Sequence, residues 1–118
     1  MDKQKIKVLV INTSPRKGRN TDQLLDEVTA GCISVSGSDD PGIGAVEVEV
    51  KRMGVYEAAD DELRFCRGCW ACAKTGSCVC GDDFIKQIHD AIASSDAVIF
   101  GVPVYFYSVT AQCKAIMD

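Results

Sequence analysis

Three apolar segments along the chain have the patterns of β-strands. Residues 5–11 (KIKVLVI) form a β-branched run that becomes apolar on both faces, as in a strand buried in a parallel sheet. Residues 45–53 (AVEVEVKRM) alternate apolar and charged positions, which is typical of a strand with one covered face at a sheet edge. Residues 96–104 (DAVIFGVPV) predict a further strand of the buried kind.

Helical patterns separate and follow these strands. Asn20 and Thr21 can cap a first helix of about 13 residues. The apolar positions that recur at helical spacing in it are Leu24, Leu25, Val28 and Ile33. Residues 82–93 open with two acidic residues and predict a second helix, whose apolar face is made of Phe84, Ile85, Ile88 and Ile92. Residues 108–118 have the pattern of a third helix opening.

This alternation predicts an α/β fold with a doubly wound parallel sheet and right-handed crossovers, over residues 1–118 as one domain. A strand as apolar as residues 96–104 belongs between two neighbours, yet no later strand follows it. We therefore expect the N-terminal portion of a domain, with a hydrophobic sheet edge that favours a homo-oligomer.

Composition narrows the class of protein. The 118 residues carry a formal net charge of −4, with 47% hydrophobic and 25% charged residues, as in ordinary soluble proteins. Positive charge clusters only near residue 16, which argues against nucleic acid or a membrane surface as the main partner. The apolar run before Asn12 is too short for a signal peptide or a membrane span, so a cytoplasmic protein is expected.

The segment SPRKGRNT at residues 14–21 follows the first predicted strand, where doubly wound folds bind ligands. A hydroxyl, positive charges and the amides of a helix N-terminus suit a small anion such as phosphate. The residues that supply these groups are Ser14, Arg16, Lys17, Arg19, Asn20 and Thr21. The plain alternative is a solvated turn with an ordinary helix cap.

A second candidate loop follows the strand at residues 96–104. Pro103, Val104, Tyr105 and Phe106 offer a flat apolar wall and backbone donors for a conjugated ring. The alternative is that Tyr105, Phe106 and Tyr107 are core aromatics.

Residues 12–25 (NTSPRKGRNTDQLL) and 96–118 (DAVIFGVPVYFYSVTAQCKAIMD) together resemble the NADPH-dependent FMN reductase family. The resemblance implies a flavodoxin-like, three-layer α/β/α fold, here with three of its usual five strands in the order 2-1-3. It also implies that the first loop holds the FMN phosphate and that the second lies along the isoalloxazine ring. The phosphate residues so implied are Ser14, Arg16, Asn20 and Thr21, and the ring residues are Pro103, Val104, Tyr105 and Phe106.

Five of the seven cysteines crowd into a loop at residues 65–81. Without an export signal, such a group points to metal or redox chemistry rather than disulfides. The spacing CxxCxxCxxxxxC can turn sulfurs toward one [4Fe-4S] cluster, while a zinc site or a loop of reduced cysteines without metal would use the same residues. The loop resembles that of the iron-sulfur flavoproteins in the same family, and this resemblance implies the ligands Cys66, Cys69, Cys72 and Cys78, with Cys80 to spare.

Four further residues are less informative. Cys32 and Cys113 are expected to be packing residues. A lone His89 on the polar face of the second helix is expected to be solvated. Trp70 could shield a cluster or a flavin, or contact another subunit.

These features predict an FMN-dependent oxidoreductase that takes electrons from NADH, NADPH or another carrier and passes them on, with a [4Fe-4S] cluster as the candidate relay. No catalytic acid or base is needed, because the cofactor carries the chemistry. The alternatives are a non-catalytic electron-transfer or metal-binding module that docks to a protein partner, and a fragment with little activity. The third flavin-contacting loop of the family follows a fourth strand, which this sequence lacks.

Overall fold

A computed structural model describes residues 4–42 and 44–118, and its centre is a parallel sheet. The strand order is β2-β3-β1-β4, with β1 parallel to both neighbours. The bounds of the strands are Gln4–Asn12 for β1, Asp39–Asp40 for β2, Gly44–Gly54 for β3 and Ala97–Gly101 for β4. The three predicted strands and their order 2-1-3 are confirmed. The two-residue β2, which pairs antiparallel with β3, lies in a segment predicted as a turn.

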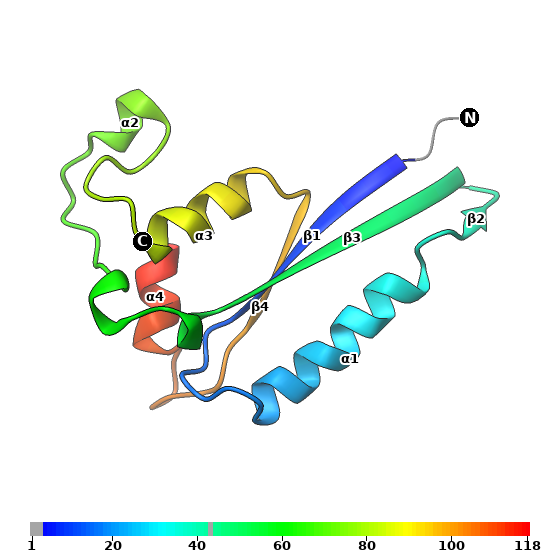
Figure 1. Ribbon diagram of the computed structural model, residues 1–118, viewed down its shortest axis with the longest axis horizontal. Coiled ribbons are helices and arrows are strands. Elements are labelled where there is room, and N and C mark those ends of the chain that lie inside the picture. Colours follow the sequence, from blue (N-terminus) through cyan, green and yellow to red (C-terminus); the bar gives the residue numbers. More distant parts are fainter. Residues whose placement is uncertain (1–3, 43) are drawn as a thin grey trace.

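Among the described residues, three helices cover the sheet and the cysteine loop contains one helical turn. Figure 1 shows one helix on one side of the strands and two on the other, which is the predicted three-layer arrangement. The bounds of the helices are Asn20–Ser34 for α1, Cys72–Thr75 for α2, Phe84–Ala93 for α3 and Ala111–Met117 for α4. Two short 3₁₀ turns follow β3, at Val55–Glu57 and Asp60–Glu62. None of the helices in the described ranges is long and apolar enough to cross a membrane.

The central strand β1 supplies both hydrophobic cores. Leu9 and Ile11 are fully buried in a cluster with residues of α3 and α4, while Val8 and Val10 pack with Leu25 of α1. Because successive strand residues point to opposite faces, a strand covered on both faces must be apolar throughout. The apolar run within residues 5–11 therefore forms a strand that is buried on both faces, as predicted.

Two details differ from the sequence expectations. The third strand ends at Gly101 instead of residue 104, because Pro103 has no N–H with which to extend a ladder. Leu24 and Ile33 of α1 are exposed, although Leu25 is buried. Leu24 lies about 100° around the helix from Leu25, which turns it away from the sheet.

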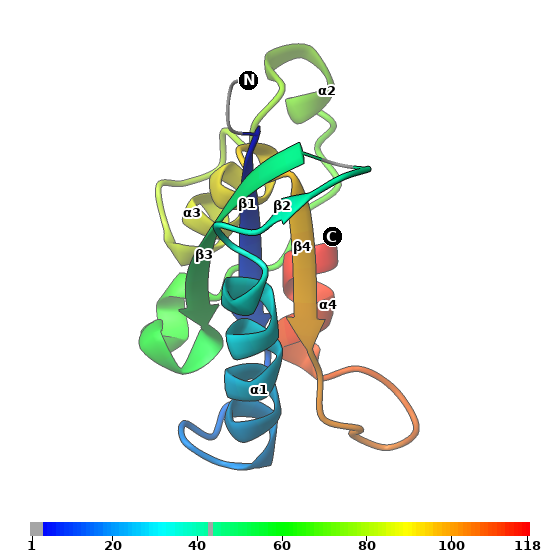
Figure 2. The same cartoon turned by 90° about the vertical axis from the view of Figure 1, so that its right-hand side faces the viewer.

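Hydrogen bonds join the carboxyl ends of β1 and β4 to the start of α4. The N–H and the hydroxyl of Thr13 both donate to the carbonyl of Gly101, over 2.9 and 2.8 Å. The hydroxyl of Thr110, the N-cap of α4, donates to the carbonyl of Thr13 over 2.9 Å and accepts from the N–H of Cys113 over 3.0 Å. The two candidate flavin loops therefore both start at the carboxyl ends of these strands, at the lower end of the sheet in Figure 2.

Candidate functional site

The first candidate site is the loop from β1 to α1, and its fold starts from a buried serine. Ser14 is only 5% exposed. Its N–H donates to the side-chain oxygen of Asn12 over 2.8 Å, and its hydroxyl accepts from the N–H of Arg16 over 3.2 Å. Arg16 and Lys17 are exposed beyond this turn. The loop is thus held at its base while its cationic side chains face solvent.

The helix that follows begins without a side-chain cap. Its N-cap residue is Arg19, which is extended and accepts no hydrogen bond from the first turn, since a guanidinium has no acceptor. The prediction that Asn20 and Thr21 cap α1 is wrong, because these two are already helical. The first-turn N–H groups are therefore available to an anion, which the positive end of the helix dipole favours.

Asp22 holds this loop in place through hydrogen bonds, and no sequence pattern pointed to it. Its carboxylate is 7% exposed and accepts from the side-chain amide of Asn12 and from the N–H of Gly18, both over 2.6 Å. Burial alone raises the pKa of this carboxyl, but the bonds from Gly18 and Asn12 and the charge of Arg52 outweigh it and hold the pKa below its ordinary value. Asp22 is thus a buried anion that ties the loop to β1 and α1.

Arg52 of β3 and Tyr56 of the 3₁₀ turn after it complete this network. Arg52 donates to Asp22 over 3.2 Å and also contacts Asp26, and the Tyr56 hydroxyl donates to Asp22 over 3.4 Å. Burial and then the charge of Asp22 raise the pKa of Tyr56. A Cβ at Gly54 would lie 2.4 Å from the Tyr56 ring, so glycine is required there. Sequence patterns place Asp22 and Arg52 on separate elements, and only the parallel pairing of β1 with β3 brings them together.

The second candidate loop presents its aromatic side chains to solvent. Tyr105 and Ser108 exchange backbone hydrogen bonds of 3.0 and 3.1 Å around a two-residue turn. Phe106 and Tyr107 form the turn with positive φ angles of 47° and 63°, and their side chains are 94% and 95% exposed. The alternative reading of these residues as core aromatics is therefore wrong.

The end of β4 fits closely against the start of α1, which brings the second loop to the first. A Cβ at Gly101 would lie 2.5 Å from Leu25 and 2.9 Å from Thr21, so only glycine allows this approach. Pro103 is half-buried just beyond this contact, and Val104 is exposed. The second loop thus starts close to the N-terminal part of α1.

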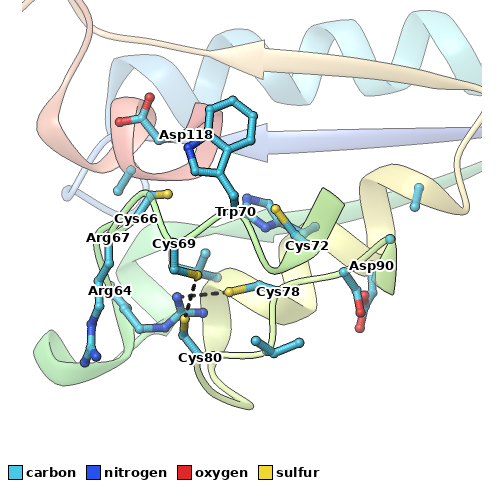
Figure 3. A pocket seen from close by; sticks show the side chains of 17 residues that line it. Arg64, Cys66, Arg67, Cys69, Trp70, Cys72, Cys78, Cys80, Asp90 and Asp118 are labelled. Carbon is cyan, nitrogen blue, oxygen red and sulfur yellow. Dashed lines mark hydrogen bonds between the residues drawn. The ribbon is translucent and has the colours of Figure 1, made fainter. Parts of the chain in front are cut away.

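The cysteine loop surrounds a separate cavity of about 290 Å³. Figure 3 shows its lining, to which the loop, α3 and α4 contribute. The thiols on the cavity wall are those of Cys66, Cys69, Cys72, Cys78 and Cys80. Figures 1 and 2 place α2, within this loop, at the opposite end of the molecule from the loop between β1 and α1.

Local hydrogen bonds change the acidity of three of these thiols. The N–H of Ala71 and then the thiol of Cys80 lower the pKa of Cys69, while Cys69 raises the pKa of Cys80. The N–H of Cys80 and then the guanidinium of Arg64 lower the pKa of Cys78. Cys69 and Cys78 are thereby favoured as thiolates, the form that binds metal.

The distance between two of the sulfurs can be compared with the geometry of a zinc site. Around one Zn²⁺ with Zn–S bonds of about 2.3 Å, tetrahedral thiolates lie about 3.8 Å apart. The sulfurs of Cys69 and Cys80 are 3.8 Å apart. Within residues 4–42 and 44–118, however, no three His, Cys, Asp or Glu side chains gather closely enough to hold a single ion. A cubane takes each thiolate on a different iron, and the five cysteines that line the cavity supply the type of donor that either kind of site needs.

Arg64 joins the two ends of the cysteine loop. Its guanidinium contacts both carboxylate oxygens of Asp83, over 2.5 and 3.3 Å, and donates to the sulfur of Cys78 over 3.3 Å. Asp83 is also the N-cap of α3 and accepts from the N–H of Lys86 over 3.0 Å. The Asp82–Asp83 pair was expected to open the helix, but no sequence pattern pointed to Arg64.

The remaining candidates have the following environments. His89 is half-buried and its Nε2 lies 2.8 Å from the carbonyl of Ile116, so the expectation of a solvated histidine is wrong. The packing of α3 against α4 brings this ring to the end of α4. Cys113 is buried, as expected, and Cys32 of α1 packs against the core cluster that contains Leu25. Trp70 is exposed on the rim of the cysteine cavity.

Comparison with known proteins finds similarity over nearly the whole chain. Residues 6–118 match the family described as NADPH-dependent FMN reductase. The chain is 33% identical over 111 residues to an iron-sulfur flavoprotein of Clostridioides difficile, a match that covers 94% of this chain and 44% of that protein. It is 34% identical over 113 residues to an iron-sulfur flavoprotein of Methanocaldococcus jannaschii, covering 96% and 51%. The chain therefore spans about half the length of the curated relatives it matches.

Proposed function

This chain belongs to the NADPH-dependent FMN reductase family, and from that premise we propose that it is the FMN-binding part of a flavin-dependent oxidoreductase. Its electron donor would be NADH, NADPH or another reduced carrier, and its cysteine loop would hold a [4Fe-4S] cluster. The observation that carries the proposal is a shared location. An uncapped helix N-terminus and an exposed aromatic loop both lie at the carboxyl ends of the strands β1 and β4.

The chain's own residues have distinct tasks at the flavin site. The first-turn amides of α1 at Asn20 and Thr21 bind the phosphate, with Ser14, Arg16 and Lys17 beside them. Pro103, Val104, Tyr105 and Phe106 provide the surface against which the flavin ring is oriented. When bound, FMN supplies the electron-carrying ring, so the protein contributes binding, orientation and electrostatics.

The cysteine loop has the donor set of a cluster site. Cys66, Cys69, Cys72 and Cys78 are the proposed ligands, and all four line the same cavity. A cluster bound there would supply one-electron transfer. The printed names of the curated relatives, iron-sulfur flavoprotein, support this assignment.

Purification without oxygen, followed by absorption spectroscopy and a nicotinamide oxidation assay, tests the proposal. Wild type is expected to show the two flavin bands with a broad cluster shoulder, and to oxidise NADH or NADPH when FMN is present. Ser14→Ala should weaken the flavin bands and keep the shoulder, whereas Cys72→Ser should do the reverse. A colourless wild type would overturn the proposal. Cofactors without nicotinamide oxidation would favour the non-catalytic electron-transfer module.

A further inference from the structure

Arg64 is an unusually restrained arginine at the entrance to the cysteine loop. Its side chain and that of Asp83, its partner across the loop, are each only 16% exposed. The guanidinium and the carboxylate meet through two contacts, a fork geometry that fixes the plane of the guanidinium. A surface arginine would move freely, but this one has a defined direction.

Helix α3 fixes the carboxylate in turn. Asp83 caps this helix through the N–H of Lys86, and α3 is anchored by buried Phe84, Ile85 and Ile88. The position of Arg64 is therefore set by the core of the molecule and not by the loop alone. One of its N–H groups remains directed at the loop, and its acceptor is the sulfur of Cys78, 3.3 Å away (Figure 3).

Hydrogen bonds to ligand sulfurs and nearby positive charge stabilise the more negative, reduced state of an iron-sulfur cluster. We propose that Arg64 is a positioning residue that raises the reduction potential of the cluster by donating an N–H to the Cys78 sulfur while Asp83 holds the guanidinium in place. This inference rests on the proposed function, because it requires the cluster and assigns its electrostatic partner.

Arg67 provides a matched control within the same loop. It has the same charge and lines the same cavity, but it is exposed and makes no hydrogen bond or ion pair with any described residue. Solvent and salt screen a charge of that kind. If net charge near the loop were sufficient, the two arginines would be equivalent, whereas a directed N–H···S bond makes only Arg64 effective.

The test is a mediated redox titration, followed by electron paramagnetic resonance, of the whole chain reconstituted with iron and sulfide under anaerobic conditions. Arg64→Gln is expected to shift the midpoint potential to more negative values than wild type, while Arg67→Gln leaves it unchanged. Arg64→Lys keeps the charge but not the planar fork, and it should lie between Arg64→Gln and wild type.

The outcomes that overturn the inference are distinct from a failure of the cluster assignment. Equal potentials in wild type and Arg64→Gln, at equal iron content, would show that Arg64 does not tune the site. Should Arg64→Gln lose its iron, a wild-type potential in Arg64→Lys would overturn the inference. A wild type that binds no iron under these conditions would overturn it together with the proposed cluster, and iron analysis of that sample identifies this case.

Discussion

At the scale of single residues, the loop between β1 and α1 depends on a buried anion. Asp22 accepts hydrogen bonds from Asn12 and Gly18 and is paired with Arg52. An unpaired carboxylate at this depth would repel the phosphate that the loop is proposed to bind. Arg52 therefore neutralises the base of the loop, although it belongs to a different strand.

Replacing Arg52 by Gln should weaken FMN binding and leave riboflavin binding almost unchanged. Hydrogen bonds to charged groups contribute about 1.5–3 kcal/mol, so a loss of about tenfold or more in FMN affinity is expected. Flavin fluorescence titrations with both ligands measure this difference. Because the defect is electrostatic, it should shrink as ionic strength rises.

Asp26→Asn is the control for this experiment. Arg52 also contacts the carboxylate of Asp26, but Asp26 makes no bond to the loop between β1 and α1. Its FMN affinity should stay close to that of wild type. Equal losses of FMN and riboflavin affinity in Arg52→Gln would mean that Arg52 only supports the fold.

The candidate site residues differ in how far sequence could reveal them. Ser14 and Arg16 follow a buried strand in a segment rich in donors, so their placement could be predicted from order along the chain. Asp22 and Arg64 could not be found in this way. Their partners lie on other elements, and Arg64 meets Asp83 across 19 positions of a loop without periodicity.

At the scale of elements, the two long strands follow the hydrophobic pattern closely. β1 and β3 each extend one residue beyond their predicted bounds at either end. The predicted cap of α1 is wrong because Asn20 and Thr21 are already helical, and the predicted end of β4 is wrong because Pro103 cannot extend the strand beyond Gly101. The tight turn at Phe106 and Tyr107 has no glycine, so sequence alone does not predict its left-handed backbone.

The junction of β1, β4 and α4 depends on one hydroxyl. Thr110 is fully buried, donates to Thr13 and accepts from Cys113. Thr110→Val keeps the shape but leaves both partners unpaired, so we expect the free energy of unfolding to fall by about 1–3 kcal/mol. Urea denaturation followed by circular dichroism measures it.

Thr29 is the matched control for Thr110. Its hydroxyl oxygen is buried and has no hydrogen-bond partner among the described residues. Thr29→Val removes a polar atom that makes no bond, so stability should stay the same or rise. If both valine variants lost stability equally, side-chain shape and not hydrogen bonding would explain the effect at residue 110.

At the scale of the whole molecule, β4 forms one edge of the sheet in the described chain. Phe100 of this strand is partly exposed and lines a shallow hollow with Ile116 and Met117 of α4. A hydrophobic strand edge favours pairing with another strand or another chain.

The 118-residue chain should therefore associate with itself in a concentration-dependent way. Sedimentation velocity over a range of concentrations is expected to show species larger than a monomer. Phe100→Lys should shift the distribution toward monomer. Val35→Lys alters an exposed apolar residue just after α1 and should have no such effect. A wild type that stays monomeric at every concentration would contradict this expectation.

The central claim is that the loop between β1 and α1 holds the phosphate of FMN. Titration of FMN and of riboflavin into the folded chain, followed by flavin fluorescence, tests it most directly. We expect saturable quenching by FMN at concentrations at least about tenfold lower than riboflavin requires, because only FMN reaches the helix N-terminus. Unquenched FMN at every concentration, or equal affinities for the two flavins, would contradict the account.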